Sequence, residues 1–327
     1  MTTPIRIGVI GCGAIATAVH IRVLRGLPGV RVTALADPEP HARIRAGRLV
    51  PSAALVASSD ELLAREDVDA VVVASSTALH APMALAVFAA GRHLYLEKPI
   101  ATTVDDGRQV AAAASATHVV SMAGFNWRFQ PLIARAKVLL SEGVLGEVRA
   151  ATTAFCEAAS VPGWKARRHD GGGVLLDLGS HHFDLMRWLL GAEMSSVHAS
   201  VESRRTEHDV AAVTLMMDSG ATVASRFSLG VEQAHWIELV GERGTMRIDR
   251  QARTLTVSGV RARTLTPALL AWRARSLVRP LSEPSWRYAL RAFVGRINGA
   301  ELEVPTMDDG VRSLEIVAAA ERAAGVA

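Results

Sequence analysis

Residues 5 to 123 alternate short apolar runs with helix-like segments, and this alternation restricts the fold more than any other feature of the sequence. The runs are continuous in Val, Ile and Ala, which indicates strands covered by helices on both faces of a sheet. We therefore predict an α/β domain with a doubly wound parallel sheet. The expected strands are 5–10, 31–36, 53–56, 70–74, 93–96 and 119–123, and the expected helices lie near 14–25, 38–47, 59–65, 78–90 and 104–117.

The pattern changes after about residue 125. A helix is expected near 131–142, a strand near 147–157 and a helix that opens at Gly172. A run of strands without intervening helices then follows, which favours a mostly antiparallel open sheet in an α+β domain. Those strands are 197–202, 211–217, 222–228, 236–240, 245–248 and 254–257, with turns at 218–220 and 241–244 and a final amphipathic helix at 311–324.

The length of 327 residues suits two domains. We assign 1–123 to the first domain and 124–327 to a second domain that binds substrate and forms oligomers, with the final helix able to pack on the first. A sheet with one face lacking helices would expose an apolar surface suited to a homodimer or homotetramer.

Composition narrows the class of protein. Two cysteines are too few for a disulfide framework or a cysteine-rich zinc site and fit a reducing compartment. No apolar run reaches the length of a membrane span, so we expect a cytoplasmic protein with no membrane partner. The net charge of +4 is small for the length, and no aromatic-interleaved basic tract indicates a nucleic-acid partner.

Most of the positive charge is local. Eight arginines and one acid, Glu283, lie between Arg261 and Arg296. This segment fits two interpretations: a flap that contacts an anionic part of a substrate, or a helix pair whose Trp272 and Trp286 are buried in an oligomer interface.

A glycine motif lies between the first expected strand and helix. Gly11 would permit a tight turn, Gly13 would let a pyrophosphate approach the backbone, and the small Ala16 would let helix pack on strand. An acid that binds ribose hydroxyls belongs at the end of the second strand, where Asp37 stands; alternatively, Asp37 caps a helix before Pro38. The combination predicts a dinucleotide site, and an acid there favours NAD over NADP, although Arg43 could weaken that preference.

Two further motifs carry candidate chemistry. Glu97-Lys98-Pro99 follows a strand in a chain with only three lysines, and its ammonium could stabilise charge on a substrate oxygen; the alternative is a surface ion pair with Glu97. In the segment from Gly171 to Asp184, the spacing puts Asp177, His181 and Asp184 on one helical face, where an imidazole could transfer a proton. The alternatives are an ordinary polar stripe or a metal site, and we expect no metal. His182 points away and is expected to be structural. Six further histidines look like isolated surface or core residues: His20, His41, His118, His198, His208 and His235.

These stretches, together with Gly124 to Phe129, resemble the Gfo/Idh/MocA oxidoreductase family in the same order along the chain. The resemblance implies a Rossmann domain and a nicotinamide cofactor, NAD with NADP possible. It also implies a polyhydroxylated substrate such as a sugar, a cyclitol or a nucleotide-linked sugar, and a cis Lys98-Pro99 peptide. Some members of the family use the cofactor transiently to epimerise, eliminate or cleave glycosides, and a non-catalytic sensor is a further alternative.

Residue roles follow from the resemblance by position. Lys98 binds the reacting oxygen, Asp177 orients the substrate and His181 is the general acid and base. Ser75-Ser76-Thr77 departs from the Thr-Pro-Asn often found in the family, although a hydroxyl there could still meet the cofactor. The expected cofactor-binding residues are Gly11, Gly13, Ala14, Ile15, Ala16, Asp37, Ser75, Thr77, His80, Glu97, Lys98 and Asn126, and the expected substrate-binding residues are Lys98, Arg128, Trp164, Asp177 and His181.

Overall fold

The computed structural model describes residues 3–159, 163–278 and 283–326, without the side chains of 268 and 275–278. The chain separates into two compact units, 1–126 with 286–314 and 127–285 with 315–327. The first change of unit lies close to the boundary expected after residue 123. The return of 286–314 to the first unit was expected from the sequence for the final helix alone, and the division between the two units falls within that helix.

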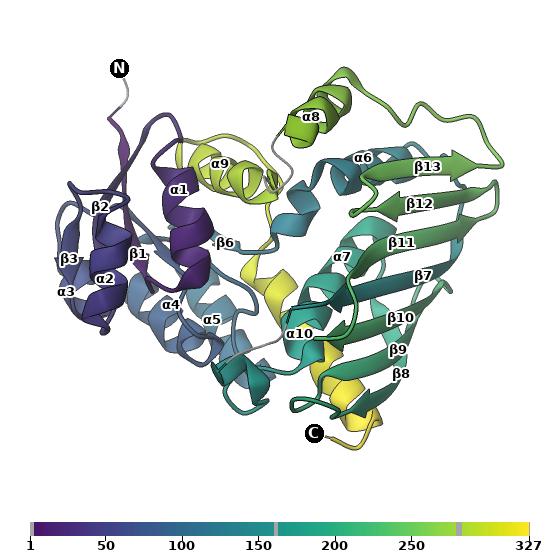
Figure 1. The fold of residues 1–327 in the computed structure, drawn as a ribbon, viewed down its shortest axis with the longest axis horizontal. Coiled ribbons are helices and arrows are strands. Elements are labelled where there is room, and N and C mark those ends of the chain that lie inside the picture. Colours follow the sequence, from purple (N-terminus) through teal and green to yellow (C-terminus); the bar gives the residue numbers. More distant parts are fainter. Residues whose placement is uncertain (1–2, 160–162, 279–282, 327) are drawn as a thin grey trace. The chain divides into compact units, whose positions relative to one another are not determined.

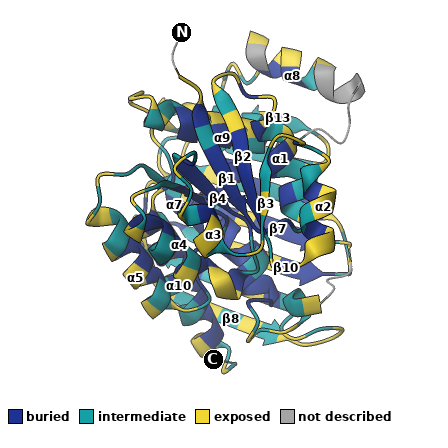
Figure 2. Cartoon of the chain, turned by 90° about the vertical axis from the view of Figure 1, so that its left-hand side faces the viewer, coloured by how far each residue is buried: buried dark blue, intermediate teal, exposed yellow. Residues whose placement is uncertain are grey.

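The first unit contains a six-stranded sheet in the order β3-β2-β1-β4-β5-β6, and each neighbouring pair is parallel (Figure 1). Its strands β1, β2 and β4 form a buried centre (Figure 2). The doubly wound parallel sheet is therefore confirmed. The strands are β1 (Ile5–Ile10), β2 (Val30–Ala36), β3 (Ala54–Val56), β4 (Ala70–Val73), β5 (His93–Leu96) and β6 (Ser121–Ala123).

Local sequence explains where several of these helices begin. The hydroxyl of Thr103 accepts a hydrogen bond from the Asp106 N–H at the start of α5, and Asp105 adds negative charge in the first turn. The helix expected at 14–25 instead contains a π-helical turn before its α-helical part. The helical elements are η1 (Ala16–His20), α1 (Ile21–Leu24), α2 (Pro40–Gly47), α3 (Ser59–Leu63), η2 (Thr77–Leu79), α4 (His80–Ala89) and α5 (Val104–Ser115).

The second unit contains a seven-stranded sheet in the order β13-β12-β11-β7-β10-β9-β8, in which only the β7–β10 pair is parallel. The mostly antiparallel sheet is thus confirmed. Helices lie along one face of this sheet, and Figure 1 draws no described helix on the other face. The strands are β7 (Val148–Glu157), β8 (Met194–Glu202), β9 (Val210–Met217), β10 (Thr222–Leu229), β11 (Ala234–Gly241), β12 (Thr245–Asp249) and β13 (Thr254–Ser258).

The helical parts of this unit differ from expectation at one important place. The helix predicted to open at Gly172 begins after the glycines and passes through a π-helical turn, η5 (Leu175–Gly179), before α7 (Ser180–Leu190). Such turns are rare and are frequently found at functional sites. The other elements here are η3 (Asn126–Phe129), α6 (Pro131–Ser141), η4 (Gly163–Ala166) and α8 (Pro267–Val278).

The arginine-rich segment forms helices on both sides of residues 279–282, which lie outside the described residues. These helices are α8 and α9 (Ser285–Ile297), and the final helix is α10 (Met307–Ala323). The rings of Phe293 in α9 and Tyr95 in β5 meet edge to face at 5.8 Å, so α9 contributes to the core of the first unit. Helix formation agrees with the helix-pair interpretation, whereas a role in oligomers stays a prediction.

Candidate active site

The glycine turn after β1 has the geometry that a phosphate cradle requires. Gly11 has a φ of +90°, and a Cβ there would meet the carbonyl group of Ala74 at 2.7 Å, so only glycine fits. A Cβ built on Gly13 meets nothing within 4 Å, which leaves open space against the backbone. Ala14 and Ile15 begin the helix, and Ala16 is buried. A pyrophosphate fits the open side of this turn.

Asp37 lies beside that turn. Its Oδ2 accepts a hydrogen bond from the Cys12 N–H at 2.7 Å, and its Oδ1 accepts one from the Glu39 N–H at 2.9 Å. The N-cap of α2 is Glu39, so the helix-cap alternative for Asp37 is wrong. Arg43 donates a hydrogen bond to the main-chain carbonyl of Asp37. A carboxylate fixed next to the glycines fits a ribose hydroxyl, and an NAD-type cofactor therefore matches the residues present.

The loop after β4 holds three residues expected at the cofactor. The Ser75 main chain borders Gly11, and Thr77 is buried in η2. The imidazole of His80 lies 2.6 Å from the Pro99 carbonyl through Nδ1 and 3.1 Å from the Ser75 carbonyl through Nε2. Burial lowers the pKa of His80, although both carbonyls oppose the shift. His80 thus links the segments that follow β4 and β5, and direct contact of these residues with a cofactor stays a prediction.

Glu97-Lys98-Pro99 follows β5, and the Lys98–Pro99 peptide is cis, as the resemblance implied. The Glu97 carboxylate accepts hydrogen bonds from His20 Nε2 at 2.8 Å and from the Lys98 N–H at 3.2 Å. Burial alone would raise the pKa of Glu97, but the hydrogen bond and charge of His20, with Lys98 and His80, lower it overall. The carboxylate is therefore held in its charged form, directly before the proposed catalytic lysine.

Sequence reasoning missed His20, which it treated as an isolated histidine. The side chain is fully buried in η1 and also meets the Tyr95 ring edge to face at 5.7 Å. Its distance of 77 positions from Glu97 left no local signal in the sequence.

The segment after β6 supplies Asn126 and Arg128. Asn126 is buried, and its N–H donates to the Gly124 carbonyl at 2.8 Å. The guanidinium of Arg128 forms two hydrogen bonds with the Asp184 carboxylate, one of them from Nε to Oδ2 at 2.9 Å. Both side chains of this pair are buried. Arg128 is thus already engaged by Asp184, and its contact with substrate stays a prediction.

The glycine run 171–173 has a packing reason. A Cβ on Gly172 would lie 2.0 Å from the carbonyl oxygen of Lys165, so the η4 turn rests directly on the glycine backbone. The Gly172 N–H donates to the Arg167 carbonyl at 2.9 Å. This close approach brings the turn that carries Trp164 and Lys165 to the start of η5.

Asp177 in η5 is bound by a lysine that sequence reasoning missed. Lys165 Nζ lies 3.1 Å from Oδ1 and 2.9 Å from Oδ2 of Asp177, and it also lies over the Trp164 ring at 5.6 Å. The scarcity of lysine was the available signal, because it applied to Lys165 as much as to Lys98. Asp177 is thus held by an ammonium, and its contact with substrate stays a prediction.

His181 lies in the first turn of α7 and is buried. Its ring stacks on the indole of Trp127, with the centroids 4.4 Å apart and the planes 4° from parallel. The structure thus fixes Asp177 and His181 in the second unit, at the junction of η5 and α7. It fixes Lys98 in the first unit, at the carboxyl edge of the parallel sheet.

His182 is buried in the core and faces the sheet. Its Nε2 lies 2.7 Å from Ser225 Oγ and 3.3 Å from Thr153 Oγ1, and burial lowers its pKa to about 3. This neutral side chain has the structural position expected of it.

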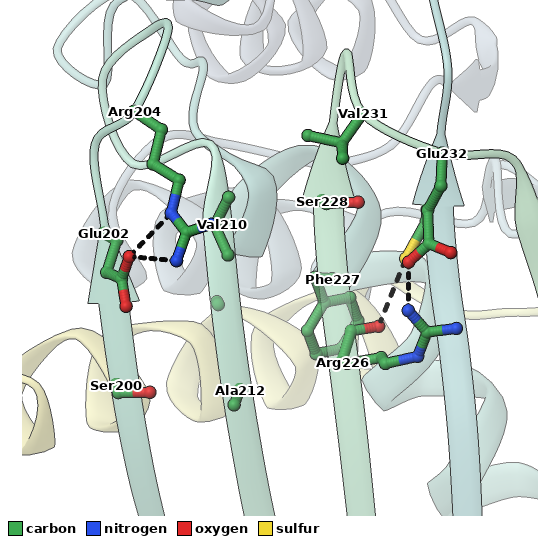
Figure 3. A pocket seen from close by; sticks show the side chains of 12 residues that line it. Ser200, Glu202, Arg204, Val210, Ala212, Arg226, Phe227, Ser228, Val231 and Glu232 are labelled. Atoms are coloured by element: carbon green, nitrogen blue, oxygen red, sulfur yellow. Dashed lines mark hydrogen bonds and ion pairs between the residues drawn. The ribbon is translucent and has the colours of Figure 1, made fainter.

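Other candidate sites carry less chemistry. A hollow of about 270 Å³ lies on the other face of the second sheet, between paired side chains such as Glu202 with Arg204 and Arg226 with Glu232 (Figure 3). Among the described residues, no three His, Cys, Asp or Glu side chains gather as metal ligands would. No helix in the described ranges is both long and apolar enough to cross a membrane.

Comparisons with known proteins match both parts of the chain to one family. Residues 5–125 match the oxidoreductase family with an NAD-binding Rossmann fold, and residues 133–247 match the GFO/IDH/MocA C-terminal domain. The chain is 31% identical over 280 residues to inositol 2-dehydrogenase of Acidothermus cellulolyticus, covering 83% of this chain and 80% of that protein. It is 30% identical over 252 residues to dTDP-3,4-didehydro-2,6-dideoxy-alpha-D-glucose 3-reductase of Streptomyces violaceoruber, covering 75% and 73%.

A solved structure extends the likeness over nearly the whole chain. GenD2 from gentamicin A biosynthesis, solved in complex with NAD, superposes with a TM-score of 0.86 at 26% identity and covers 99% of this chain and 95% of that one. With the glycine turn, Asp37 and the cis Lys98–Pro99 peptide in place, these relationships establish the class of protein. The chain belongs to the GFO/IDH/MocA family of NAD(P)-dependent oxidoreductases that act on CH–OH groups.

Proposed function

We propose that the chain interconverts a hydroxyl and a keto carbon of a sugar, a cyclitol or a nucleotide-linked sugar, with NAD as the preferred cofactor. The observation that carries the proposal is the buried His181 four positions after the Lys165-bound Asp177, in a chain that also holds a built dinucleotide turn. When bound, the nicotinamide accepts or supplies the hydride. Gly11, Gly13 and Asp37 would hold its pyrophosphate and ribose.

The remaining roles belong to side chains of this chain. In the oxidation direction, His181 takes the hydroxyl proton of the substrate, and the Lys98 ammonium donates a hydrogen bond to the same oxygen as negative charge develops there. In reduction, His181 returns that proton. Asp177, with Lys165, binds neighbouring hydroxyl groups and sets the orientation of the carbon. Ser75, Thr77, His80 and Asn126 are proposed to border the cofactor.

The direct test begins with native mass spectrometry of the purified protein for bound nicotinamide. A screen of sugars, cyclitols and nucleotide-linked sugars with NAD and NADP then follows the absorbance of the reduced cofactor. His181→Asn is expected to lower kcat by about 10²- to 10⁴-fold, the range that general acid–base catalysis contributes, while NAD binding is unchanged. The control is His198→Asn, an exposed residue of β8.

Three results would contradict parts of the proposal. If the protein binds neither NAD nor NADP, the proposed dinucleotide site is wrong. Turnover that survives in both His181→Asn and Lys98→Met removes the assigned chemistry. Product without net change in reduced cofactor identifies a redox-neutral epimerase, lyase or glycosidase.

A further inference from the structure

The ring of His181 is restrained by an aromatic partner from a different element. Trp127 in η3 and His181 in α7 lie 54 positions apart, yet their rings are nearly parallel and stack at 4.4 Å. Both side chains are buried. The centroid of the indole lies 4.9 Å from the ring centroid of Phe155 in β7 and 5.4 Å from that of His235 in β11. A ring held on several sides limits rotation of the imidazole that stacks on it.

A cationic side chain also lies over the same indole. The guanidinium carbon of Arg250, in the turn after β12, lies 4.4 Å from the centroid of the Trp127 ring. Arg250 Nη1 donates to His235 Nδ1 at 2.9 Å, and Nη2 lies 3.3 Å from Glu283. Burial and the nearby Arg250 charge lower the pKa of His235 to about 3, so the imidazole stays neutral and accepts the hydrogen bond. The positive charge therefore remains on the guanidinium.

We infer that Trp127 and Arg250 are positioning residues for His181: the indole fixes the plane of the imidazole, and the guanidinium charge over the same indole disfavours the imidazolium. Trp127 links the two groups, because the imidazole stacks on its ring and the guanidinium carbon lies over the same ring. The catalytic part of this inference rests on the proposed role of His181. The electrostatic part concerns the folded protein alone and needs no substrate.

Two carboxylates on the helical segment of His181 each have a cationic partner. On its own helical segment, Asp177 is bound by Lys165 of η4, and Asp184 is bound by Arg128 of η3. The neighbouring His182 is buried and neutral and faces β7 and β10. Neither pair includes Arg250, so both are the same in the wild type and in the Arg250 variants.

Three more titratable groups lie near Trp127 or Arg250. His235 of β11 is neutral, Glu157 of β7 lies 3.2 Å from it, and Glu283 partly offsets Arg250. The two carboxylates are placed by their contacts with His235 and Arg250, and the guanidinium by its contact with the indole. Arg250 is the one whose charge contacts the indole directly, so we expect its effect to dominate when it alone is changed.

The test measures the titration of His181 without any substrate. Full-length protein with ¹³C-labelled histidine is titrated by NMR from pH 4.5 to 9, and the His181 signal is assigned by its loss in His181→Asn. Arg250→Met is expected to raise the His181 midpoint by about 0.3 to 1.3 pH units, the effect of one charge within about 9 Å at an effective dielectric constant of roughly 80 to 20. Arg250→Lys should restore most of the original midpoint.

The chain offers a matched control. Arg247 of β12 lies 4.5 Å from the centroid of Trp236, an equivalent contact that does not involve Trp127. Arg247→Met should leave the His181 midpoint unchanged. A second variant, Trp127→Leu, removes the stacked ring and should broaden or shift the His181 signal while Arg250 remains.

The outcomes separate this inference from the proposed function. An unchanged midpoint in Arg250→Met, including a His181 signal that titrates in neither protein, overturns the inference, as does an equal shift in Arg247→Met. If Arg250→Met fails to fold, the His181 signals of Arg250→Lys and Trp127→Leu are compared instead. Arg250→Lys should keep the wild-type midpoint and Trp127→Leu should shift or broaden the signal, so equal behaviour of the two variants counts against the inference. If the His181 midpoint shifts but the protein turns over no substrate, the electrostatic coupling is supported and a catalytic role for it is not. With a substrate from the screen, the acid limb of kcat for oxidation should move to higher pH by the same amount.

Discussion

Replacing His20 by leucine would leave the buried Glu97 carboxylate without its hydrogen-bond partner. Glu97 accepts a hydrogen bond from His20 Nε2 at 2.8 Å, and both side chains are buried. Leucine is similar in volume and can still pack against Tyr95, so the main loss is the hydrogen bond and its charge. Breaking a buried pair from one side typically costs about 3–5 kcal/mol of unfolding free energy, because the remaining charge is left without its partner. In a domain of this size that corresponds to a fall in Tm of about 6–20 °C.

The pH dependence gives this prediction a sign. In the native protein the pKa of Glu97 is lowered, so the pair contributes stability above the unfolded pKa of about 4.3 and loses it as the pH falls through the folded pKa. Without His20, burial dominates and raises the pKa of Glu97 above the unfolded value. The variant is then penalised at high pH, and the penalty shrinks as Glu97 takes up a proton. The difference in unfolding free energy between the wild type and His20→Leu should therefore narrow as the pH falls from 8 to 5.

Urea unfolding followed by circular dichroism at pH 8, 6.5 and 5 measures the gap. The double variant His20→Leu/Glu97→Gln replaces the charge by a neutral amide and should recover about 1–3 kcal/mol of the loss, since an unpaired neutral group costs less than a charge. Arg65→Met is the control: it breaks a half-exposed pair with Asp67 and should cost less than about 1 kcal/mol. A gap that stays constant with pH, or a double variant less stable than His20→Leu, would refute the reasoning.

Three further predictions concern the cofactor turn and the core. Gly11→Ala should destabilise the fold and abolish NAD binding, because its Cβ collides with the main chain at positive φ. Gly13→Ala should keep the melting temperature and weaken NAD binding. Isothermal calorimetry measures the binding and thermal melts measure the stability. Asp37→Ser should weaken NAD by about 10- to 100-fold, the value of a hydrogen bond to a charged group, and favour NADP because Arg43 stays nearby; an unchanged ratio of the two Kd values contradicts this. His182 has a folded pKa of about 3, below its unfolded value, so its burial costs stability progressively as the pH falls below about 6.5, and His182→Gln should flatten the loss of unfolding free energy between pH 6.5 and 5.

The first sheet was predictable because its strands carry their own signal. β4 is a run of alanine and valines with every side chain buried, which is what a strand covered on both faces requires. Motifs tied to backbone geometry were equally accessible: Gly11 needs its positive φ, and Asp37 needs only its place after β2. In each case the physical requirement falls on a few neighbouring residues.

The π-helical turn at η5 could not be predicted in this way. The spacing of Asp177 and His181 is compatible with one face of an α-helix, but a π turn holds more residues, so spacing alone does not define their geometry. The partners that hold these residues are also remote: Lys165 for Asp177, and Trp127 for His181. Their pairing depends on which elements the tertiary fold brings together, and a single sequence does not record that.

The buried partners also explain why these chemical groups can be kept inside the protein at all. A carboxylate or an imidazole loses hydration when it is buried, and the fold remains stable only if other polar groups replace the water. Glu97 meets this condition through His20, and the partly buried Asp177 meets it through Lys165, whose side chain is 39% exposed. Because such partners also fix the orientation of each group, the residues that make burial tolerable are the ones that prepare the group to bind or to transfer a proton. Replacing a partner should therefore change stability and chemistry together, whereas replacing an exposed ion pair such as Arg65 with Asp67 should change neither appreciably.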